Sequence, residues 1–232
     1  MGEKRTAVIF DLDGTLLDTL DDITDSVNHV IVPRGFCAVS RDAVKGFVGN
    51  GAKRLIERAM YAKVGDLDTQ VDDPALAEQC YNEFLAYYKD HNNVKTAPYE
   101  GILGVLEQLG SKGIPLAVVS NKPDDSVRVL CDSHFSNRLA IARGDRAGQP
   151  RKPDPTVLLD TIRELGCDTA IYVGDSEPDI RVAENAKIPS VLMTWGFRDR
   201  QTLIGNGAKI LADNADELLA ALSRLLGTDF GE

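Results

Sequence analysis

The chain has 232 residues, of which 43% are hydrophobic, and carries a formal net charge of -10 with a pI near 4.8. This length and composition are sufficient to bury a large core, either as one domain or as a domain with an insertion. The excess of acidic residues argues against nucleic acid or an anionic membrane surface as the main partner, because both would repel the protein. An anionic substrate would need local positive charge or a metal ion.

Cysteine and histidine usage suggests neither disulfides nor a metal site of their own. The four cysteines lie far apart without a CxxC pair, and the three histidines show no metal-ligand spacing. The first ten residues, MGEKRTAVIF, lack the long apolar stretch of a signal peptide or membrane span. We therefore expect a protein of the reducing cytoplasm, a monomer or homodimer, with no nucleic-acid or membrane partner.

Short apolar runs rich in β-branched residues recur along the chain, and most are separated by helical patterns. They lie at 6–10, 114–120, 170–174 and 190–194. This alternation predicts an α/β fold with a doubly wound parallel sheet. The stretch after the first run interrupts it with three or four helical patterns and no convincing strand. We therefore expect an α/β core domain from residues 1–17 and 95–232, with a helical cap domain inserted at 18–94.

Polar residues stand at the carboxyl ends of three of these runs. They are Asp11 and Asp13 after the first run, Ser120, Asn121 and Lys122 at the second, and Asp175 after Gly174 of the third, with Asp179 four residues further. The carboxyl ends of parallel strands share one edge of a sheet, where such folds bind ligands. Lys152, in RKPDP, lies in a loop just before a helical pattern. A lone DxDG is equally typical of a capped turn, but this conjunction of groups favours a functional site.

These residues resemble the four motifs of the haloacid dehalogenase-like hydrolases. DLDGTLLDT is similar to the first motif, VVSNK to the second, RKPDP to the third and VGDSEPD to the fourth, and the likeness runs from residue 6 to about 197. The helical segment resembles the small cap that one subgroup inserts after the first motif. Within that subgroup the phosphoglycolate phosphatase-like members are most similar, through FVGNGAKRLIERA, SNKP and VLMTWGFR. Many relatives have a glycine where this chain has Ala186-Lys187.

The resemblance implies a Mg²⁺-dependent phosphatase that acts on a small phosphorylated metabolite. Dehalogenases lack the second acid of the first motif, so Asp13 favours phosphoryl transfer. Asp11 would attack phosphorus to form an aspartyl phosphate, while Asp13 would protonate the leaving alkoxide and later take a proton from water. The implied metal ligands are Asp11, the main-chain carbonyl of Asp13 and Asp175, and Asp179 would be a further ligand or would hold a metal-bound water. Lys152 would pair with Asp11 and the phosphoryl oxygens.

Three further core residues are candidates for the phosphate site. The Ser120 hydroxyl would hydrogen-bond the transferring group. The Thr15 hydroxyl either orients Asp13 or caps the turn, and Asn121 either binds phosphate or substrate or forms a turn. Outside the phosphate site, Arg198 in WGFR is a candidate to assist in binding an anionic leaving group, by analogy between folds alone.

Substrate choice is expected to come from the cap. In GNGAKRL, Gly49 and Gly51 permit a tight loop at a helix N-terminus, whose N–H groups could bind an anion, and Lys53 and Arg54 follow. The alternative interpretation is a helix start with ordinary exposed cations. The first interpretation favours a small anionic leaving group such as glycolate.

Other functions share parts of this pattern. β-Phosphoglucomutase-like phosphosugar mutases, pyrophosphatases and nucleotide phosphatases have the same core motifs. A response-regulator receiver, from a different class, also places acids, a hydroxyl residue and a lysine around Mg²⁺, but the DxD, the cap and the chain length count against it. A catalytically silent binding module is a third alternative, although every core motif position is filled.

Overall fold

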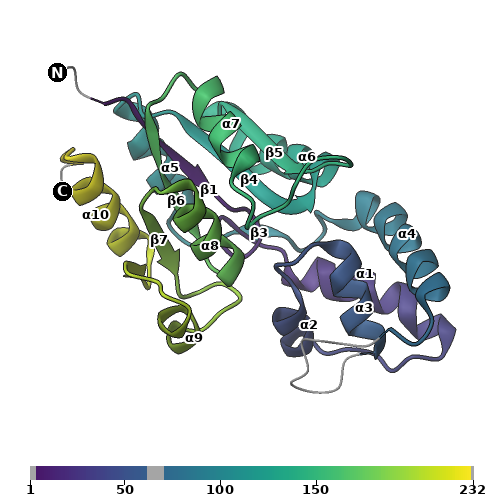
Figure 1. The fold of residues 1–232 in the computed structure, drawn as a ribbon. Helices are drawn as coiled ribbons and strands as arrows, with labels where there is room; N and C mark the ends of the chain where they lie inside the picture. The colour runs from purple at the N-terminus through teal and green to yellow at the C-terminus, as the bar shows by residue number, and fades with distance from the viewer. Residues whose placement is uncertain (1–3, 62–70, 231–232) are drawn as a thin grey trace. The chain divides into compact units, whose positions relative to one another are not determined.

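The computed structural model describes residues 4–61 and 71–230 and divides the chain into two compact units (Figure 1). The sheet unit comprises Met1–Asp18 and Pro98–Glu232, and the helical unit comprises Thr19–Ala97. The chain therefore passes between the units twice. Two short strands at these crossings, β2 (Leu17–Asp18) and β3 (Ala97–Pro98), pair with each other.

A six-stranded sheet in the order β5-β4-β1-β6-β7-β8 forms the centre of the sheet unit. Its strands are β1 (Thr6–Phe10), β4 (Leu116–Pro123), β5 (Ile141–Asp145), β6 (Thr169–Gly174), β7 (Ser190–Met193) and β8 (Leu211–Ala212). All neighbouring strands are parallel. The predicted doubly wound α/β core with an inserted helical domain is confirmed.

Two of these strands were not predicted. β5 is an edge strand with the sequence IARGD, and most of its residues are only half-buried. Because Arg143 and Asp145 interrupt its apolar pattern, no run of hydrophobic residues marks it. β8 contains only two residues and leaves no periodic signal.

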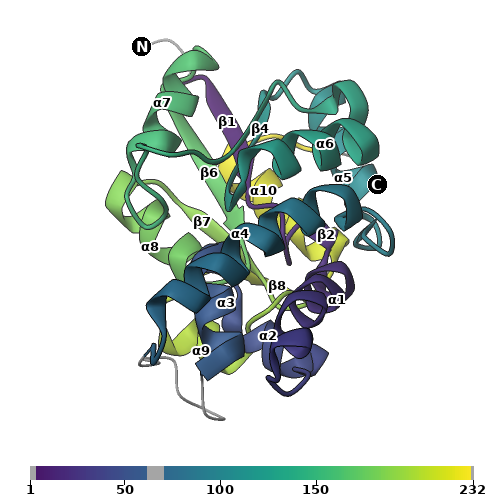
Figure 2. The same cartoon turned by 90° about the vertical axis from the view of Figure 1, so that its right-hand side faces the viewer.

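Helices cover both faces of the sheet. They are α5 (Ile102–Ser111), α6 (Asp124–Phe135), α7 (Thr156–Glu164), α8 (Glu177–Ala186), α9 (Arg200–Gly205) and α10 (Ala215–Leu226), with a short 3-10 turn, η2 (Ser136–Arg138). In Figure 2, α7 and α8 lie to the left of the sheet and α5, α6 and α10 to the right.

The central strand β1 explains this layering. Successive side chains of a strand point to opposite faces. Val8 and Phe10 pack with α5, α6 and α10, whereas Ala7 and Ile9 pack with α7 and α8. Burial of a side chain such as Phe10 stabilises the fold by about 1.5–3 kcal/mol. The strand is thus held on both faces, and its carboxyl end is a rigid platform.

The helical unit contains α1 (Leu20–Ile31), η1 (Val32–Arg34), α2 (Arg41–Phe47), α3 (Ala52–Tyr61) and α4 (Pro74–His91). A buried carboxylate ties its ends together. Asp22 on α1 accepts hydrogen bonds from the N–H groups of Val94, Lys95 and Thr96 at 2.9–3.0 Å and from the Thr96 hydroxyl at 2.7 Å. Asp22 therefore fixes the segment that follows α4 to the start of α1.

Three smaller features complete the fold. No helix in the described ranges is both long and apolar enough to cross a membrane. The four cysteines are free thiols. α8 ends at Ala186, and Lys187 takes a left-handed conformation with a φ of 58°, the kind of helix end that glycine serves with less strain.

Candidate active site

The loop after β1 carries two carboxylates. The main-chain N–H of Asp11 donates to Val173 O at 2.8 Å, which extends the pairing of β1 with β6 by one residue. The N–H of Leu12 donates to Asp11 Oδ1, also at 2.8 Å. Gly14 then turns the chain with a φ of 81°, a region that glycine enters without strain. Asp11 and Asp13 therefore project from a main chain held by β6 and by this turn.

Three buried carboxylates from separate elements meet beside this loop. Asp11 follows β1, Asp175 follows β6 and Asp179 lies in the first turn of α8, and one oxygen of each lies within 4.8 Å of the others. Glycine permits this approach, because a Cβ on Gly14 would come within 2.8 Å of Asp175 Cγ. A Cβ on Gly174 would overlap the Asp179 side chain. The ligand atoms are all oxygens, which fits a hard divalent cation.

Burial and the crowding of negative charge raise the pKa values of two of these carboxyl groups. Burial raises the pKa of Asp11 from 3.8 to about 6, although the nearby Lys152 ammonium opposes this. Burial raises the pKa of Asp175 well above its usual range, and the charges of Asp179 and Asp11 raise it further. The N–H of Phe197, which donates to Asp175 Oδ2 at 2.7 Å, acts in the opposite direction. A divalent cation among these oxygens would lower both carboxyl pKa values.

A buried lysine faces the same carboxylates. Lys152 Nζ lies 3.0 Å from Asp11 Oδ1, 2.7 Å from Asp179 Oδ1 and 2.9 Å from the Tyr172 hydroxyl oxygen. The Tyr172 hydroxyl donates to Val119 O at 2.7 Å, so its oxygen can accept from the ammonium. Burial alone would lower the pKa of Lys152, but Asp11 and Asp179 raise it well above its usual range. The lysine is therefore charged and fixed in position.

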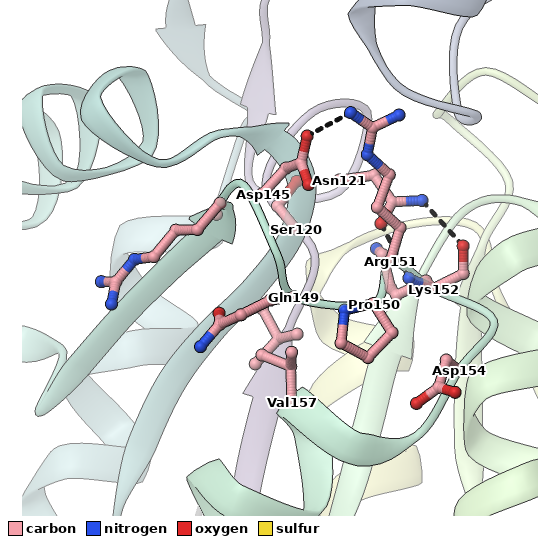
Figure 3. Close-up of a pocket in the computed structure, with 12 residues that line it drawn as sticks. Ser120, Asn121, Asp145, Gln149, Pro150, Arg151, Lys152, Asp154 and Val157 are labelled. Carbon is pink, nitrogen blue, oxygen red and sulfur yellow. Dashed lines mark hydrogen bonds and ion pairs between the residues drawn. The ribbon is translucent and has the colours of Figure 1, made fainter.

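The loop that carries this lysine is held to β4 by Asn121 (Figure 3). Asn121 Oδ1 accepts from the N–H of Lys152 at 2.9 Å, and its Nδ2 donates to the Lys152 carbonyl oxygen at 3.1 Å. The preceding Arg151 turns toward Asp145, at 2.6 Å. Asn121 was predicted to bind phosphate or substrate or to form a turn. In the structure both ends of its amide hold the main chain of Lys152.

The residues on either side of Asn121 point to the two acids of the first loop. Alternate residues of a strand face the same way. The Ser120 hydroxyl hydrogen-bonds Asp11, which lowers the pKa of that carboxyl. Two residues further, Lys122 Nζ donates to both carboxylate oxygens of Asp13, at 2.8 and 3.1 Å. The i, i+2 spacing of the acids is therefore matched by an i, i+2 spacing of their partners.

Two predicted site residues have partners that the sequence did not specify. Thr15 Oγ1 donates to Asp175 Oδ1 at 2.9 Å, so its hydroxyl braces that carboxylate rather than Asp13. Asp179 Oδ2 accepts from the N–H groups of Asp175 and Ser176 at 3.1 and 3.0 Å and from the Ser176 hydroxyl at 2.7 Å. Asp179 is thus the N3 residue of a capping box at the start of α8.

The predicted cap residues lie in the helical unit. Gly51 has a φ of 87° immediately before α3. Lys53 Nζ lies 2.6 Å from Glu78 Oε2, and its hydrogen bond to Glu78 raises its pKa. Arg54 pairs with Glu57 at 3.1 Å within α3. An anionic ligand of either cation would have to compete with a carboxylate of the same unit.

Arg58, which the sequence analysis did not single out, supports this loop. The residue is 7% exposed, and its Nη1 donates to Phe47 O at 2.8 Å and to Asn50 Oδ1 at 3.0 Å. The guanidinium therefore links α3 to the residues that precede it. The signal was available in the sequence, because Arg58 lies three positions after Leu55 on the buried face of α3.

Arg198 and Tyr172 both contact charged side chains of the sheet unit. Arg198 Nε donates to both oxygens of Glu177 in the first turn of α8, at 2.8 and 2.9 Å. Tyr172, which contacts Lys152, lies within an apolar run of the sequence and was predicted only as part of a strand.

The sequence matches a known class of hydrolases. Residues 8–193 match the family model of the haloacid dehalogenase-like hydrolases, and the chain belongs to this family. It is 36% identical over 200 residues to a phosphoglycolate phosphatase of Mesorhizobium japonicum, with 85% of this chain and 86% of the relative covered. It is 38% identical over 195 residues to a phosphoglycolate phosphatase of Agrobacterium fabrum, with 82% and 81% covered.

Solved structures agree with this assignment. A crystal structure from Lactobacillus delbrueckii subsp. bulgaricus, described as a candidate phosphoglycolate phosphatase, has a TM-score of 0.89 and 34% identity. It covers 94% of this chain, which covers 98% of it. The predicted family and the resemblance to its phosphoglycolate phosphatase-like members are confirmed.

Proposed function

We propose that the protein is a Mg²⁺-dependent phosphatase that hydrolyses a small phosphate monoester of the phosphoglycolate type. The observation that carries this proposal is a single cluster in which Asp11 adjoins a charged lysine, Lys152, and two further buried carboxylates, Asp175 and Asp179. The names of the relatives, at 36% and 38% identity, support the substrate class.

In the first half-reaction Asp11 is the nucleophile. Its carboxylate attacks phosphorus, the bond from phosphorus to the leaving oxygen breaks, and Asp13 gives a proton to that oxygen. The contacts of Asp11 Oδ1 with the Leu12 N–H and with Lys152 restrain the carboxylate before the reaction. Such restraint reduces the entropy lost on reaching the attack geometry. The products are an aspartyl phosphate and the free alcohol.

In the second half-reaction water attacks phosphorus of the aspartyl phosphate. Asp13 accepts the proton of that water, phosphate departs, and the carboxylate of Asp11 is regenerated. The Lys152 ammonium and the Ser120 hydroxyl stabilise the charge on the phosphoryl oxygens through charge-assisted and neutral hydrogen bonds.

The metal would be held by the side chains of Asp11, Asp175 and Asp179 and by the main-chain carbonyl of Asp13. Bound there, Mg²⁺ supplies positive charge to neutralise the phosphoryl group and the surrounding acids. The all-oxygen donor set and the raised pKa values of Asp11 and Asp175 support this assignment. Thr15 would keep Asp175 oriented toward the ion.

The mechanism is tested by substitution and by chelation. Asp11→Asn is expected to abolish turnover, and Asp13→Asn to lower kcat/KM for an alkyl phosphate by about 10²–10⁴-fold. EDTA is expected to remove activity and excess Mg²⁺ to restore it. Asp160→Asn, on the exposed side of α7, is the matched control and keeps the wild-type rate. Near-normal rates in Asp11→Asn, or full activity after rigorous chelation, would contradict the proposal.

The substrate class is tested separately with a panel of phosphorylated metabolites. Phosphoglycolate is expected to give a higher kcat/KM than hexose phosphates, nucleoside monophosphates or pyrophosphate. Steady release of inorganic phosphate over many turnovers distinguishes a phosphatase from a phosphosugar mutase, which returns the phosphoryl group to a sugar. A single phosphorylation without turnover would indicate a receiver-like switch instead.

Recognition of the leaving group by the helical unit has its own test. If Lys53 and Arg54 contact the carboxylate of the substrate, replacing both with alanine lowers kcat/KM for phosphoglycolate by about 10- to 100-fold. The loss with p-nitrophenyl phosphate is then much smaller. If the variant has the same kcat/KM as the wild type for each of the two substrates, Lys53 and Arg54 are ordinary exposed cations of the helix surface.

A further inference from the structure

Lys122 is a buried cation to which neither the sequence motifs nor the mechanism above assigns a role. It lies on β4, two residues after Ser120. Its side chain is 2% exposed, and its ammonium contacts both oxygens of Asp13, whose side chain is 17% exposed. The contact joins residues 109 positions apart in the chain, so that it depends on the pairing of β1 with β4.

The two acids of the first loop are anchored differently. Asp11 adjoins the Leu12 N–H, Lys152 and Ser120. Within residues 4–61 and 71–230, the hydrogen bonds given to the Asp13 carboxylate come from Lys122 alone. Asp13 also lies one residue before the turn at Gly14, beyond the regular pairing of the strand. Lys122 therefore supplies the side-chain contacts that restrain the Asp13 rotamer.

A proton donor is effective only within hydrogen-bond reach of the leaving oxygen. Small misplacements matter, because a shift of about 1 Å can cost about 10²-fold in rate. A bidentate contact restricts rotation of the carboxylate more than a single hydrogen bond does, since it fixes the carboxylate at two points. We propose that Lys122 is the positioning residue that holds the Asp13 carboxylate in line with the leaving oxygen. This inference rests on the proposed function, in which Asp13 is the acid and base.

Misplacement of Asp13 is expected to slow some substrates more than others. Departure of an alkoxide needs the proton of Asp13, whereas p-nitrophenolate is a stable anion that needs little help. For a reaction with a covalent intermediate, kcat/KM reports the steps up to departure of the first product. Loss of Lys122 is therefore expected to reduce kcat/KM for alkyl phosphates selectively, whichever half-reaction limits kcat.

The experiment compares Lys122→Met with the wild type on phosphoglycolate and on p-nitrophenyl phosphate. We expect a loss of about 10- to 100-fold in kcat/KM for phosphoglycolate. The loss for p-nitrophenyl phosphate is expected to be at least about fivefold smaller. Lys122→Arg, which retains a cation able to bind a carboxylate bidentately, is expected to recover part of the loss. Lys112→Met, at an exposed position after α5, is the matched control and leaves both values unchanged.

A double-mutant cycle tests whether Lys122 acts through Asp13. In the Asp13→Asn background, Lys122→Met is expected to lower kcat/KM for phosphoglycolate by no more than about threefold further. Multiplicative losses, or equal losses on both substrates, would overturn the inference and leave Lys122 with a structural or phosphate-binding role. If Lys122→Met does not fold by circular dichroism, Lys122→Gln replaces it in the same cycle.

Failure of the inference differs from failure of the proposed function. If the wild type does not hydrolyse phosphoglycolate, the substrate class is wrong, and the cycle is run on glycerol phosphate or another alkyl phosphate that is turned over. If Asp13→Asn has no effect on an alkyl phosphate, the role of Asp13 is wrong and the inference falls with it. If Asp13→Asn is slow but Lys122→Met behaves as wild type, the inference alone is refuted.

Discussion

Replacement of Asp179 with asparagine tests the most heavily hydrogen-bonded carboxylate of the site. Asp179 is fully buried and accepts hydrogen bonds on both oxygens. Oδ2 accepts from two N–H groups and a hydroxyl of Asp175 and Ser176, and Oδ1 accepts from the Lys152 ammonium at 2.7 Å. Asparagine has one acceptor oxygen. If that oxygen replaces Oδ2, the amide NH₂ faces the ammonium, and if the amide is reversed, NH₂ faces three donors.

The cost can be bounded from these contacts. Loss of one charge-assisted hydrogen bond costs about 1.5–3 kcal/mol, and breaking a buried ion pair costs about 3–5 kcal/mol. Because Lys152 keeps its contacts with Asp11 at 3.0 Å and Tyr172 at 2.9 Å, the lower part of this range applies. We therefore expect Asp179→Asn to reduce the free energy of unfolding of the sheet unit by about 3 kcal/mol. Turnover falls as well, because Lys152 loses a partner that positions it.

Urea unfolding followed by circular dichroism, in EDTA, measures this change. With an m value of about 3 kcal/mol/M, the midpoint falls by about 1 M. Asp160→Asn, which breaks an exposed ion pair with Arg163, changes the free energy of unfolding by no more than about 0.5 kcal/mol. A loss below about 1 kcal/mol for Asp179→Asn in EDTA would refute the argument. A loss seen only with Mg²⁺ would mean that Asp179 acts chiefly as a metal ligand.

Three further predictions follow from the same site and from the helical unit. Burial raises the pKa of Asp11 to about 6, so without metal the folded chain binds more protons than the unfolded chain and becomes less stable as pH rises from about 4 to 6. Bound Mg²⁺ removes this loss, so the increase in Tm on adding Mg²⁺ should be larger at pH 7.5 than at pH 5. Equal increases at the two pH values would contradict the charge argument. Gly196→Ala places a Cβ against Asp175, so it is expected to lower the free energy of unfolding in urea by about 1–3 kcal/mol and to weaken Mg²⁺ binding measured by calorimetry. In the control Gly110→Ala the added Cβ meets nothing within 4 Å, and neither change is expected. Similar effects of the two substitutions would refute the packing argument. Asp22→Ala leaves three N–H groups after α4 without their acceptor, so hydrogen exchange of those amides is expected to become at least about tenfold faster. Unchanged exchange rates would show that the Asp22 carboxylate does not hold that segment.

Much of the core site was predictable because its residues are local to strand ends. The runs 6–10 and 170–174 correspond to β1 and β6, whose carboxyl ends bring Asp11 and Asp175 together. Parallel pairing makes this convergence a consequence of chain direction, without knowledge of side-chain packing. By contrast, β5 was missed because an edge strand needs no continuous apolar run.

The partners of individual side chains depended on the tertiary structure. The sequence indicated that Thr15 and Lys122 lie near the site, but it could not show that Thr15 donates to Asp175 or that Lys122 holds Asp13. These contacts join residues 160 and 109 positions apart. They are set by the register between strands and by rotamers fixed in a packed interior. A one-residue change in the register of β4 would turn Lys122 to the opposite face, and the position of Thr15 depends on the turn after β1. Residue types and spacing therefore predicted the site but not its internal connections.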